Sequence, residues 1–522
     1  MLRRTRRQFL SEVTQGMLVA AVGFEAANSL DLAPAFGAGD GGSERLTFGK
    51  LEPLVQLLQE SEPARLLPEI TRRLRTGTPL RDVVAATALA NARTFGGEDY
   101  VGFHTLMALA PSYQMALSLP EDRRALPVLK VLYRNCNRIG EYGGPASEVL
   151  HAIALNDAAK STADGAKLSD AIHRKDMAEA ERIFARIAQG SVDAAFNELL
   201  VAVEEGSEVH RVVLPYRARN LVDLVGVEHA HTLLRQSVRY CVANESEKYR
   251  EMTKGGRDVL PKLLDQYRLL GAVSTERTAD DAWVASLSES IFRSTPDDAA
   301  EAVAASLAEG FSWEAIGEAI SLAANQLVLR DAGRPEKQAR PPEKPVGSVH
   351  GDSIGVHASD SANAWRNMAR FADQRNRVAC LILGAHQVAH DRASRGGDFL
   401  NWRPYPTDEH LQAVRGKTPD EVLHEAEAAI RENNQTLAAS AIHRYGELGG
   451  DSHAVFSLLL GYAISEDGAL HAEKYYQTVT ENFAATRPSL RWRHLVSLAR
   501  VTASAYGFPA AGVREAEEFL KS

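Results

Sequence analysis

Residues 102–116, GFHTLMALAPSYQMA, and residues 355–369, GVHASDSANAWRNMA, carry a glycine, a histidine and a closing Met-Ala pair at the same positions. A second match links residues 193–200, DAAFNELL, to residues 453–460, HAVFSLLL. Each segment has the apolar spacing of a buried helix, and each match joins the first half of the chain to the second. The sequence therefore predicts a helical protein that repeats itself.

Apolar residues recur at spacings of three and four over much of the chain, and alternating strand-like patterns are scarce. The clearest helical segments are residues 51–75, 80–94, 171–188, 299–307, 313–329 and 421–442. Breaks are predicted at glycine pairs such as Gly255-Gly256 and in the Pro-rich stretch 333–347. We predict an all-α helical repeat array of two duplicated halves, forming either an open α-solenoid or a closed toroid-like bundle.

The repeats divide the chain into four helical units, each with a histidine that opens a helix: His104, His210, His357 and His471. A basic side chain follows each histidine by 20 to 23 residues: Arg124, His231, Arg377 and His494. Chance similarity between Ala-rich helices is the alternative explanation. The predicted organisation is a signal peptide over 1–35, a flexible Gly-rich linker over 36–47, a first half over 48–254 and a second half over 255–522.

The composition excludes several classes of protein. The chain has 522 residues, 45% of them hydrophobic and 24% charged, as expected of a folded protein. A net charge of −9 argues against a nucleic-acid partner. The cysteines, Cys136, Cys241 and Cys380, form no CxxC pair, so neither a disulfide framework nor a thiolate zinc site is indicated. Motifs for covalent haem, nucleotide phosphates and acyl hydrolysis are also absent from the sequence.

The N-terminus carries the most specific short motif. Residues 5–10, TRRQFL, match a twin-arginine export signal, an apolar stretch follows over 16–24, and a small-residue site permits cleavage after Ala35. An ordinary amphipathic helix is the alternative. We predict recognition by the twin-arginine translocation machinery and a periplasmic or extracellular location. No later stretch has the 18–20 apolar residues of a membrane helix, so no stable membrane span is expected after cleavage.

The repeated histidines suggest a metal centre. Neutral imidazole is a good transition-metal ligand, and a closed array would bring His104, His210, His357 and His471 together by symmetry. Iron is the expected metal, with zinc or copper as alternatives. Arg124 and Arg377 would stabilise developing negative charge, and His231 or His494 would move protons. The competing interpretation is that the histidines are buried packing elements.

A second concentration of metal-binding residue types lies in residues 348–360, SVHGDSIGVHASD. Here the Pro-rich stretch leads to His350, Asp352 and His357 at a predicted helix start. Imidazole with carboxylate suits non-haem iron or a catalytic zinc. In the alternative, the segment is a solvated loop in which Asp352 or Asp360 caps the next helix. His386 and His390, four residues apart, form a weaker candidate pair.

Three of these segments resemble the questin oxidase-like family, which comprises α-helical proteins associated with Baeyer–Villiger-type oxidation of anthraquinones. The matching segments are residues 103–109, FHTLMAL, residues 355–366, GVHASDSANAWR, and Leu470-His471. The resemblance implies oxidative chemistry on a hydrophobic ring compound. An exported enzyme lacks a supply of reduced nicotinamide, so an electron-donor protein is an expected partner.

These observations lead to one functional hypothesis and two rivals. We predict an exported metal-dependent oxidoreductase, oxygenase-like, that acts on a hydrophobic or aromatic small molecule through a central histidine cluster. The first rival is a zinc-dependent hydrolase that uses the same histidines. The second is a non-enzymatic helical-repeat scaffold or binding protein of the cell envelope.

Overall fold

The computed structural model describes residues 45–153, 163–271, 277–394 and 396–521. Helices are the only regular elements within these ranges, and the only extended pairings described there are isolated bridges. The predicted all-α helical array is confirmed. The predicted signal peptide and most of the predicted linker lie outside the described residues. Arg45, near the end of that linker, contacts the first half of the chain through an ion pair of 2.7 Å with Glu148.

The helices follow one another in the same order four times, and we call each set of five a quarter. The first and second quarters comprise α3 (Glu52–Glu60), α4 (Pro63–Arg75), α5 (Leu80–Phe95), α6 (Tyr100–Leu117) and α7 (Leu126–Tyr142), then α8 (Gly165–His173), α9 (Met177–Ile187), α10 (Val192–Val203), α11 (Val209–Val225) and α12 (Ala230–Ala243). The third and fourth comprise α14 (Asp281–Arg293), α15 (Pro296–Ala308), α16 (Trp313–Arg330), α17 (Ile354–Phe371) and α18 (Gln374–Ser394), then α20 (Pro419–Arg431), α21 (Gln435–Glu447), α22 (Ser452–Ser465), α23 (His471–Ala484) and α24 (Trp492–Ala505).

The remaining helices connect or close the quarters. They are α13 (Glu247–Gln266), α19 (Asp408–Gln412) and α25 (Val513–Lys521), with short 3-10 helices at Gly49–Leu51, Gly144–Ser147, Val227–His229, Glu336–Gln338 and Gly468–Leu470. The C-terminal helix α25 packs on α4 and α7, so the end of the chain returns to the first quarter.

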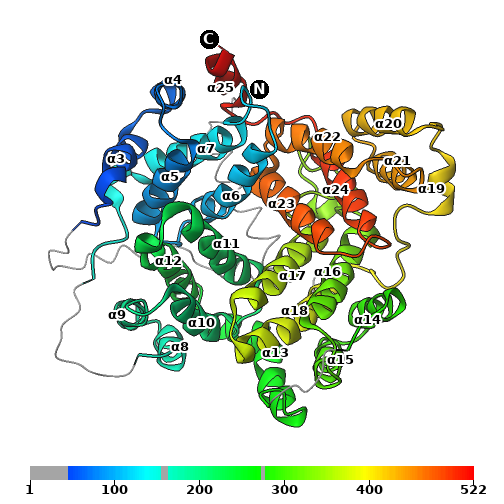
Figure 1. The fold of residues 1–522 in the computed structure, drawn as a ribbon, viewed down its shortest axis with the longest axis horizontal. Helices are drawn as coiled ribbons and strands as arrows, with labels where there is room; N and C mark the ends of the chain where they lie inside the picture. Colours follow the sequence, from blue (N-terminus) through cyan, green and yellow to red (C-terminus); the bar gives the residue numbers. More distant parts are fainter. Residues whose placement is uncertain (1–44, 154–162, 272–276, 395, 522) are drawn as a thin grey trace.

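The fourth helix of each quarter lies at the centre of the molecule (Figure 1). These inner helices form a closed circuit of contacts, in which α6 packs on α11, α11 on α17, α17 on α23, and α23 on α6. The array is therefore the closed bundle and not the open solenoid. Closure brings the first turns of four helices, hundreds of residues apart in sequence, to a common centre.

Long stretches of the inner helices α6 and α17 are buried on all sides, which explains their sequences. In α17, every residue from Gly355 to Ala369 is buried, and α6 is buried over Gly102–Ser112. A helix that is covered on all sides needs no polar face. The shared glycine allows the inner helix to approach its predecessor: a Cβ atom on Gly355 would lie 2.5 Å from the backbone nitrogen of Val328 in α16.

Several predicted boundaries differ from the structure. Gly255-Gly256, expected to break the chain, lies inside α13, as does the predicted junction between the halves at residues 254 and 255. Glycine is tolerated there because α13 packs on both α15 and α18, and tertiary packing outweighs the weak helix propensity of glycine. Three predicted helices are each divided in two: residues 51–75 between α3 and α4, residues 171–188 between α8 and α9, and residues 421–442 between α20 and α21.

An ion-pair cluster between α9 and α12 gives a test of the packing in the second quarter. Glu181 accepts hydrogen bonds from Arg235 at 2.6 Å and from Arg239 at 2.7 Å. Burial opposes ionisation, but the two guanidinium groups lower the pKa of Glu181 below its ordinary value of 4.5. A lowered carboxyl pKa stabilises the fold above pH 4.5, and that contribution disappears as the pH falls through the folded-state pKa.

Glu181→Gln is therefore expected to lower the melting temperature near pH 7, and the difference from wild type should shrink as the pH falls below 4.5. Thermal melting from pH 7 to pH 3 measures both effects. Glu179→Gln on the same helix removes an exposed pair with Arg182 and serves as the control, with little expected change. A difference in melting temperature between Glu181→Gln and wild type that grows as the pH falls would contradict the prediction.

Candidate metal centre

The four repeated histidines converge at one end of the central bundle. His104 comes from α6, His210 from α11, His357 from α17 and His471 from α23. The ring centres are 4.9 Å apart for His104 and His210, 5.2 Å for His104 and His471, 5.9 Å for His210 and His357, and 5.3 Å for His357 and His471. We call these residues the histidine cluster. Residues 367 positions apart in the chain thus share one site.

The cluster is closed off from solvent. The exposed fractions of these residues are 2% for His104, 4% for His210, 2% for His357 and 1% for His471. Aromatic rings cover it on one side: the rings of Tyr100 and Phe103 lie tilted beside that of His104, with centres 4.3 and 4.9 Å away. Each histidine lies in or just after the first turn of its helix, where the helix dipole favours neutral over cationic imidazole.

Oxygen acceptors fix the orientation of three of the imidazoles. Nδ1 of His104 lies 2.8 Å from the carbonyl oxygen of Tyr100, and Nδ1 of His471 lies 3.2 Å from that of Ala469. Nδ1 of His210 lies 2.7 Å from the Glu208 carboxylate. Because these partners are acceptors, the proton is assigned to Nδ1 and the lone pair to Nε2. This is the arrangement by which proteins orient histidine ligands.

The Nε2 atoms meet inside the cluster. Nε2 of His357 lies 3.2 Å from Nε2 of His471. Nε2 of His104 and Nε2 of His210 are buried and have no hydrogen-bond partner among the described residues. A buried nitrogen without a partner is costly in a purely structural role. The cluster therefore holds two lone pairs that the described protein groups leave unused.

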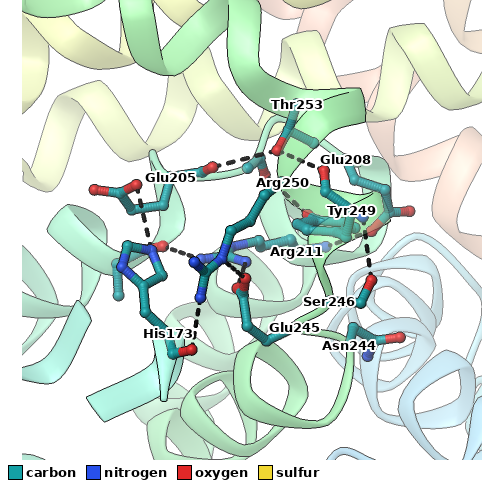
Figure 2. Close-up of polar contacts among 12 residues, drawn as sticks. His173, Glu205, Glu208, Arg211, Asn244, Glu245, Ser246, Tyr249, Arg250 and Thr253 are labelled. Atoms are coloured by element: carbon teal, nitrogen blue, oxygen red, sulfur yellow. Dashed lines mark hydrogen bonds and ion pairs between the residues drawn. The ribbon is translucent and has the colours of Figure 1, made fainter. Parts of the chain in front are cut away.

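Glu208 is the principal support of His210. Its carboxylate caps α11 by accepting the backbone N–H groups of His210 and Arg211, and it also accepts the Tyr240 hydroxyl at 2.9 Å. Burial would raise the pKa of Glu208, but His210 and these hydrogen bonds lower it to about 2. Figure 2 shows Glu208 beside Arg211 and Tyr249, next to a polar network that includes Glu245 and Arg250.

A buried positive charge lies on the other side of the cluster. Lys474, one turn after His471, is 3% exposed, and burial lowers its pKa to about 8. Burial, assisted by the positive charge of Lys474, lowers the pKa of both His104 and His471 well below the ordinary value. Both imidazoles are therefore neutral at pH 7, the form that binds a metal ion.

Polar side chains continue along the axis beyond Lys474. Asp360 of α17 accepts a hydrogen bond of 2.7 Å from Thr478 of α23, and burial raises its pKa. Further along, Arg217 of α11 pairs with Glu481 at 3.0 Å. These contacts join α11 and α17 to α23 and hold the inner helices in register.

His350 and Asp352 follow the Pro-rich stretch and lie next to the cluster. The Asp352 carboxylate, however, is paired with two basic side chains. Arg334 and Lys344 pair with the Asp352 carboxylate at 2.7 and 2.5 Å. His350 is buried, and burial lowers its pKa to about 4. Gly351, between these two residues, packs closely against His471: a Cβ atom added to Gly351 would lie 2.3 Å from the Cβ atom of His471.

The cap of α17 is Ser353, whose side chain accepts the Val356 N–H, and not Asp352 or Asp360. The segment is also not a solvated loop: Ser348, His350 and Asp352 are each less than 10% exposed. It covers the histidine cluster from outside the ring of helices.

The basic residues that follow each histidine lie elsewhere. His231 stacks on Phe184, and His494 lies 3.3 Å from the Thr486 hydroxyl. Arg377 donates to the carbonyl oxygens of Ala369 and Ala372 at the end of α17. Arg124 lies in the exposed turn before α7. Within the described contacts none of the four touches the cluster, so their catalytic roles remain predictions.

The rings are close together but do not form a finished coordination sphere. Among the residues that the structure describes, no group of three or more His, Cys, Asp or Glu side chains has the geometry of a metal site. The cluster is thus a compact set of imidazoles, three of which are held at their Nδ1 atoms.

Several residues that support the cluster were not expected from the sequence. Glu208 and Lys474 are the most important. Each lies within one turn of a repeated histidine, and Glu208 precedes a predicted helix start as capping residues do. Their positions relative to the histidines are not repeated in the other quarters, so self-comparison of the sequence gives no signal for them.

The chain matches no family model, no curated protein and no solved structure in the three comparisons made. In the described part of the chain, no helix has both the length and the apolar character needed to cross a membrane.

Proposed function

We propose that the histidine cluster binds a transition-metal ion, with iron as the occupant, and that the protein is an exported oxidoreductase acting on a hydrophobic or aromatic small molecule. The observation that carries this proposal is the convergence of four buried imidazoles from four separate quarters, with Nδ1 held by oxygen acceptors in three of them. Export through the twin-arginine pathway is part of the proposal and rests on residues 5–10.

The residues present fit a metal ion. His104 and His210 offer buried Nε2 lone pairs that lack partners among the described residues, and His357 and His471 place their Nε2 atoms in contact. The proposal includes rotation of the imidazole side chains, because no described group has the finished geometry. A bound redox metal would supply one-electron chemistry and a binding position for dioxygen.

The surrounding residues have their own roles in this proposal. Glu208 and the carbonyl oxygens of Tyr100 and Ala469 hold the histidines in the ligating tautomer. Tyr100, Phe103 and residues 348–352 exclude water from the cluster. Burial, assisted by Lys474, keeps His104 and His471 neutral, and the Lys474 ammonium favours negative charge that develops beside the cluster.

Elemental analysis of the exported, folded protein tests this proposal. We expect about one iron ion per chain, together with oxygen consumption when a reductant and a hydroxylated aromatic compound are supplied. A fully folded protein that contains no transition metal and takes up none in titration with Fe²⁺, Cu²⁺ or Zn²⁺ would refute it. Such a result would favour the scaffold alternative.

A zinc-dependent hydrolase is the second candidate. Two nitrogen ligands at 2.0–2.1 Å from a tetrahedral zinc ion lie about 3.3–3.4 Å apart. The Nε2 atoms of His357 and His471 are separated by 3.2 Å, close to this value. Stoichiometric zinc with no oxygen dependence would support this candidate over the oxidoreductase.

A further inference from the structure

The histidine pair of α18 lies outside the histidine cluster and has no part in the proposed function. His386 and His390 are four residues apart, so they share one face of the helix, and both line a cavity of about 770 Å³. His386 is 5% exposed, whereas His390 is half-buried. The two rings are nearly parallel, with centres 6.3 Å apart. Two histidines at this spacing on one helix face are the chelating unit of helical zinc sites.

Two glycines of α13 face the buried member of this pair. A Cβ atom on Gly255 would lie 3.0 Å from Nε2 of His386, and a Cβ atom on Gly256 would lie 3.5 Å from Nδ1. Each glycine inside a helix costs about 1 kcal/mol relative to alanine. The glycine pair therefore has a local consequence that offsets this cost, because it leaves space beside both ring nitrogens of a buried histidine.

Two buried polar atoms border the space beside Gly256. Nδ1 of His386 and Oγ of Ser207 are buried and have no hydrogen-bond partner among the described residues. They lie 3.5 and 3.2 Å from the position of a Gly256 Cβ atom, and both residues line the cavity. A buried polar atom without a partner carries a free-energy cost that a bound ligand removes. Both atoms are therefore placed to contact one ligand at the wall of the cavity.

Oxygen atoms orient both imidazoles of the pair. Nε2 of His386 lies 3.7 Å from the carboxylate of Asp297 in α15, whose negative charge favours the tautomer with the proton on Nε2 and the lone pair on Nδ1. Nδ1 of His390 lies 3.3 Å from Oγ of Ser394. The Ser394 hydroxyl donates to the carbonyl oxygen of His390 at 2.7 Å, so Oγ accepts the Nδ1 proton and the lone pair is assigned to Nε2. Burial, assisted by the nearby His390, lowers the pKa of His386 to about 4, so its ring is neutral at pH 7.

From this geometry we infer that α18 carries a metal site separate from the histidine cluster, in which Nδ1 of His386 and Nε2 of His390 bind one divalent transition-metal ion. His386 stays in place, and rotation of the half-buried His390 ring brings its Nε2 to the ion. Ser207 and water from the cavity supply the remaining ligands. Nitrogen sites bind Cu²⁺ most tightly among the divalent first-row metals.

The proposed site differs from the histidine cluster in how firmly it holds its ion. With two imidazole ligands and an open side toward the cavity, the ion exchanges with solvent and is removed by a chelator. It therefore does not add to the iron expected in the histidine cluster. The inference does not rest on the proposed function.

Cu²⁺ titration of the folded His104→Ala/His357→Ala variant tests the inference, because this variant lacks two of the ligands proposed for the cluster. We expect saturable binding of about one exchangeable Cu²⁺, with an electron paramagnetic resonance spectrum of two imidazole nitrogens, and weaker binding of Ni²⁺ and Zn²⁺. Adding His390→Ala should weaken Cu²⁺ binding by at least about tenfold. The same loss is expected when His390→Ala is made in the wild-type chain.

Gly256→Ala separates metal binding from folding. The added Cβ atom occupies the space beside Nδ1 of His386 and should weaken Cu²⁺ binding by at least about tenfold. Its other close neighbours, at 3.2 Å, are the ends of the Leu383 and Ser207 side chains, and alanine favours the helix, so the melting temperature should not fall. Gly461→Ala in α22 is the matched control, because a Cβ atom there meets no described neighbour within 4 Å. It should leave Cu²⁺ binding unchanged.

Four results would each overturn the inference. They are the absence of saturable Cu²⁺ binding, a spectrum with one imidazole nitrogen only, unchanged affinity in His390→Ala, and equal losses of affinity in Gly256→Ala and Gly461→Ala. These results are independent of the histidine cluster. A chain that contains no iron but binds Cu²⁺ through His386 and His390 supports this site and counts only against the proposed function.

Discussion

Replacing His104 and His357 together with alanine is expected to abolish stoichiometric metal binding while leaving a folded helical protein. The two residues lie in different quarters, on α6 and α17. Their loss removes half of the proposed ligands while each helix loses only one side chain. Loss of a residue that only orients a ligand lowers metal affinity by about 10- to 100-fold. Removing two ligands should therefore lower metal affinity by more than about 100-fold, as measured by competition with a chelator of known affinity.

The matched control is His231→Ala. His231 is also a largely buried imidazole, with no described hydrogen-bond partner at Nε2, but it lies against Phe184 away from the cluster. Metal content of this variant should equal that of wild type. Circular dichroism and gel filtration establish that each variant is folded. Full metal occupancy in the folded double variant would show that the histidine cluster is not the metal centre.

Lys130→Met is expected to give the largest loss of stability. The Lys130 ammonium is 3% exposed and pairs at 2.7 Å with Glu473, whose side chain is fully buried in α23. It also donates to the carbonyl oxygens of Ala463 and Glu466 at the end of α22. Removing one member of a buried pair leaves an uncompensated charge, at a cost of about 3–5 kcal/mol.

This pair lies where the first quarter meets the fourth, so the effect extends to the position of His471. Chemical denaturation of Lys130→Met should show a markedly lower midpoint, and hydrogen exchange should increase in α22 and α23. The double variant Lys130→Met/Glu473→Leu removes both charges and should recover most of the lost stability. A double variant no more stable than the single one would contradict this account.

The fold class follows from local patterns. Apolar spacing of three and four predicts helices because it places apolar side chains on one face, and this signal is strong in segments such as 313–329, which forms most of α16. Boundaries were less reliable. Gly255-Gly256 has the composition of a break, yet contacts with α15 and α18 stabilise a continuous α13, and sequence alone does not show those contacts.

The candidate site was only partly predictable. Repetition identified the four histidines because equivalent residues in related units occupy equivalent positions, and closure of the bundle then brings them together. Repetition also suggested Arg124, His231, Arg377 and His494, which lie away from the cluster in the structure. Those residues are spaced regularly from the histidines but belong to other helices or turns, whose side chains point to different parts of the core.

The sequence by itself determined that the chain is helical, that it repeats, and that each repeat carries a histidine near the start of an inner helix. Only the tertiary structure decided that the array closes, that the imidazoles meet within 6 Å of one another around the circuit, and that Glu208 holds His210 and burial keeps His104 and His471 neutral. Periodicity is a property of neighbouring residues, whereas closure depends on the small angles between successive helices, which accumulate over the whole chain.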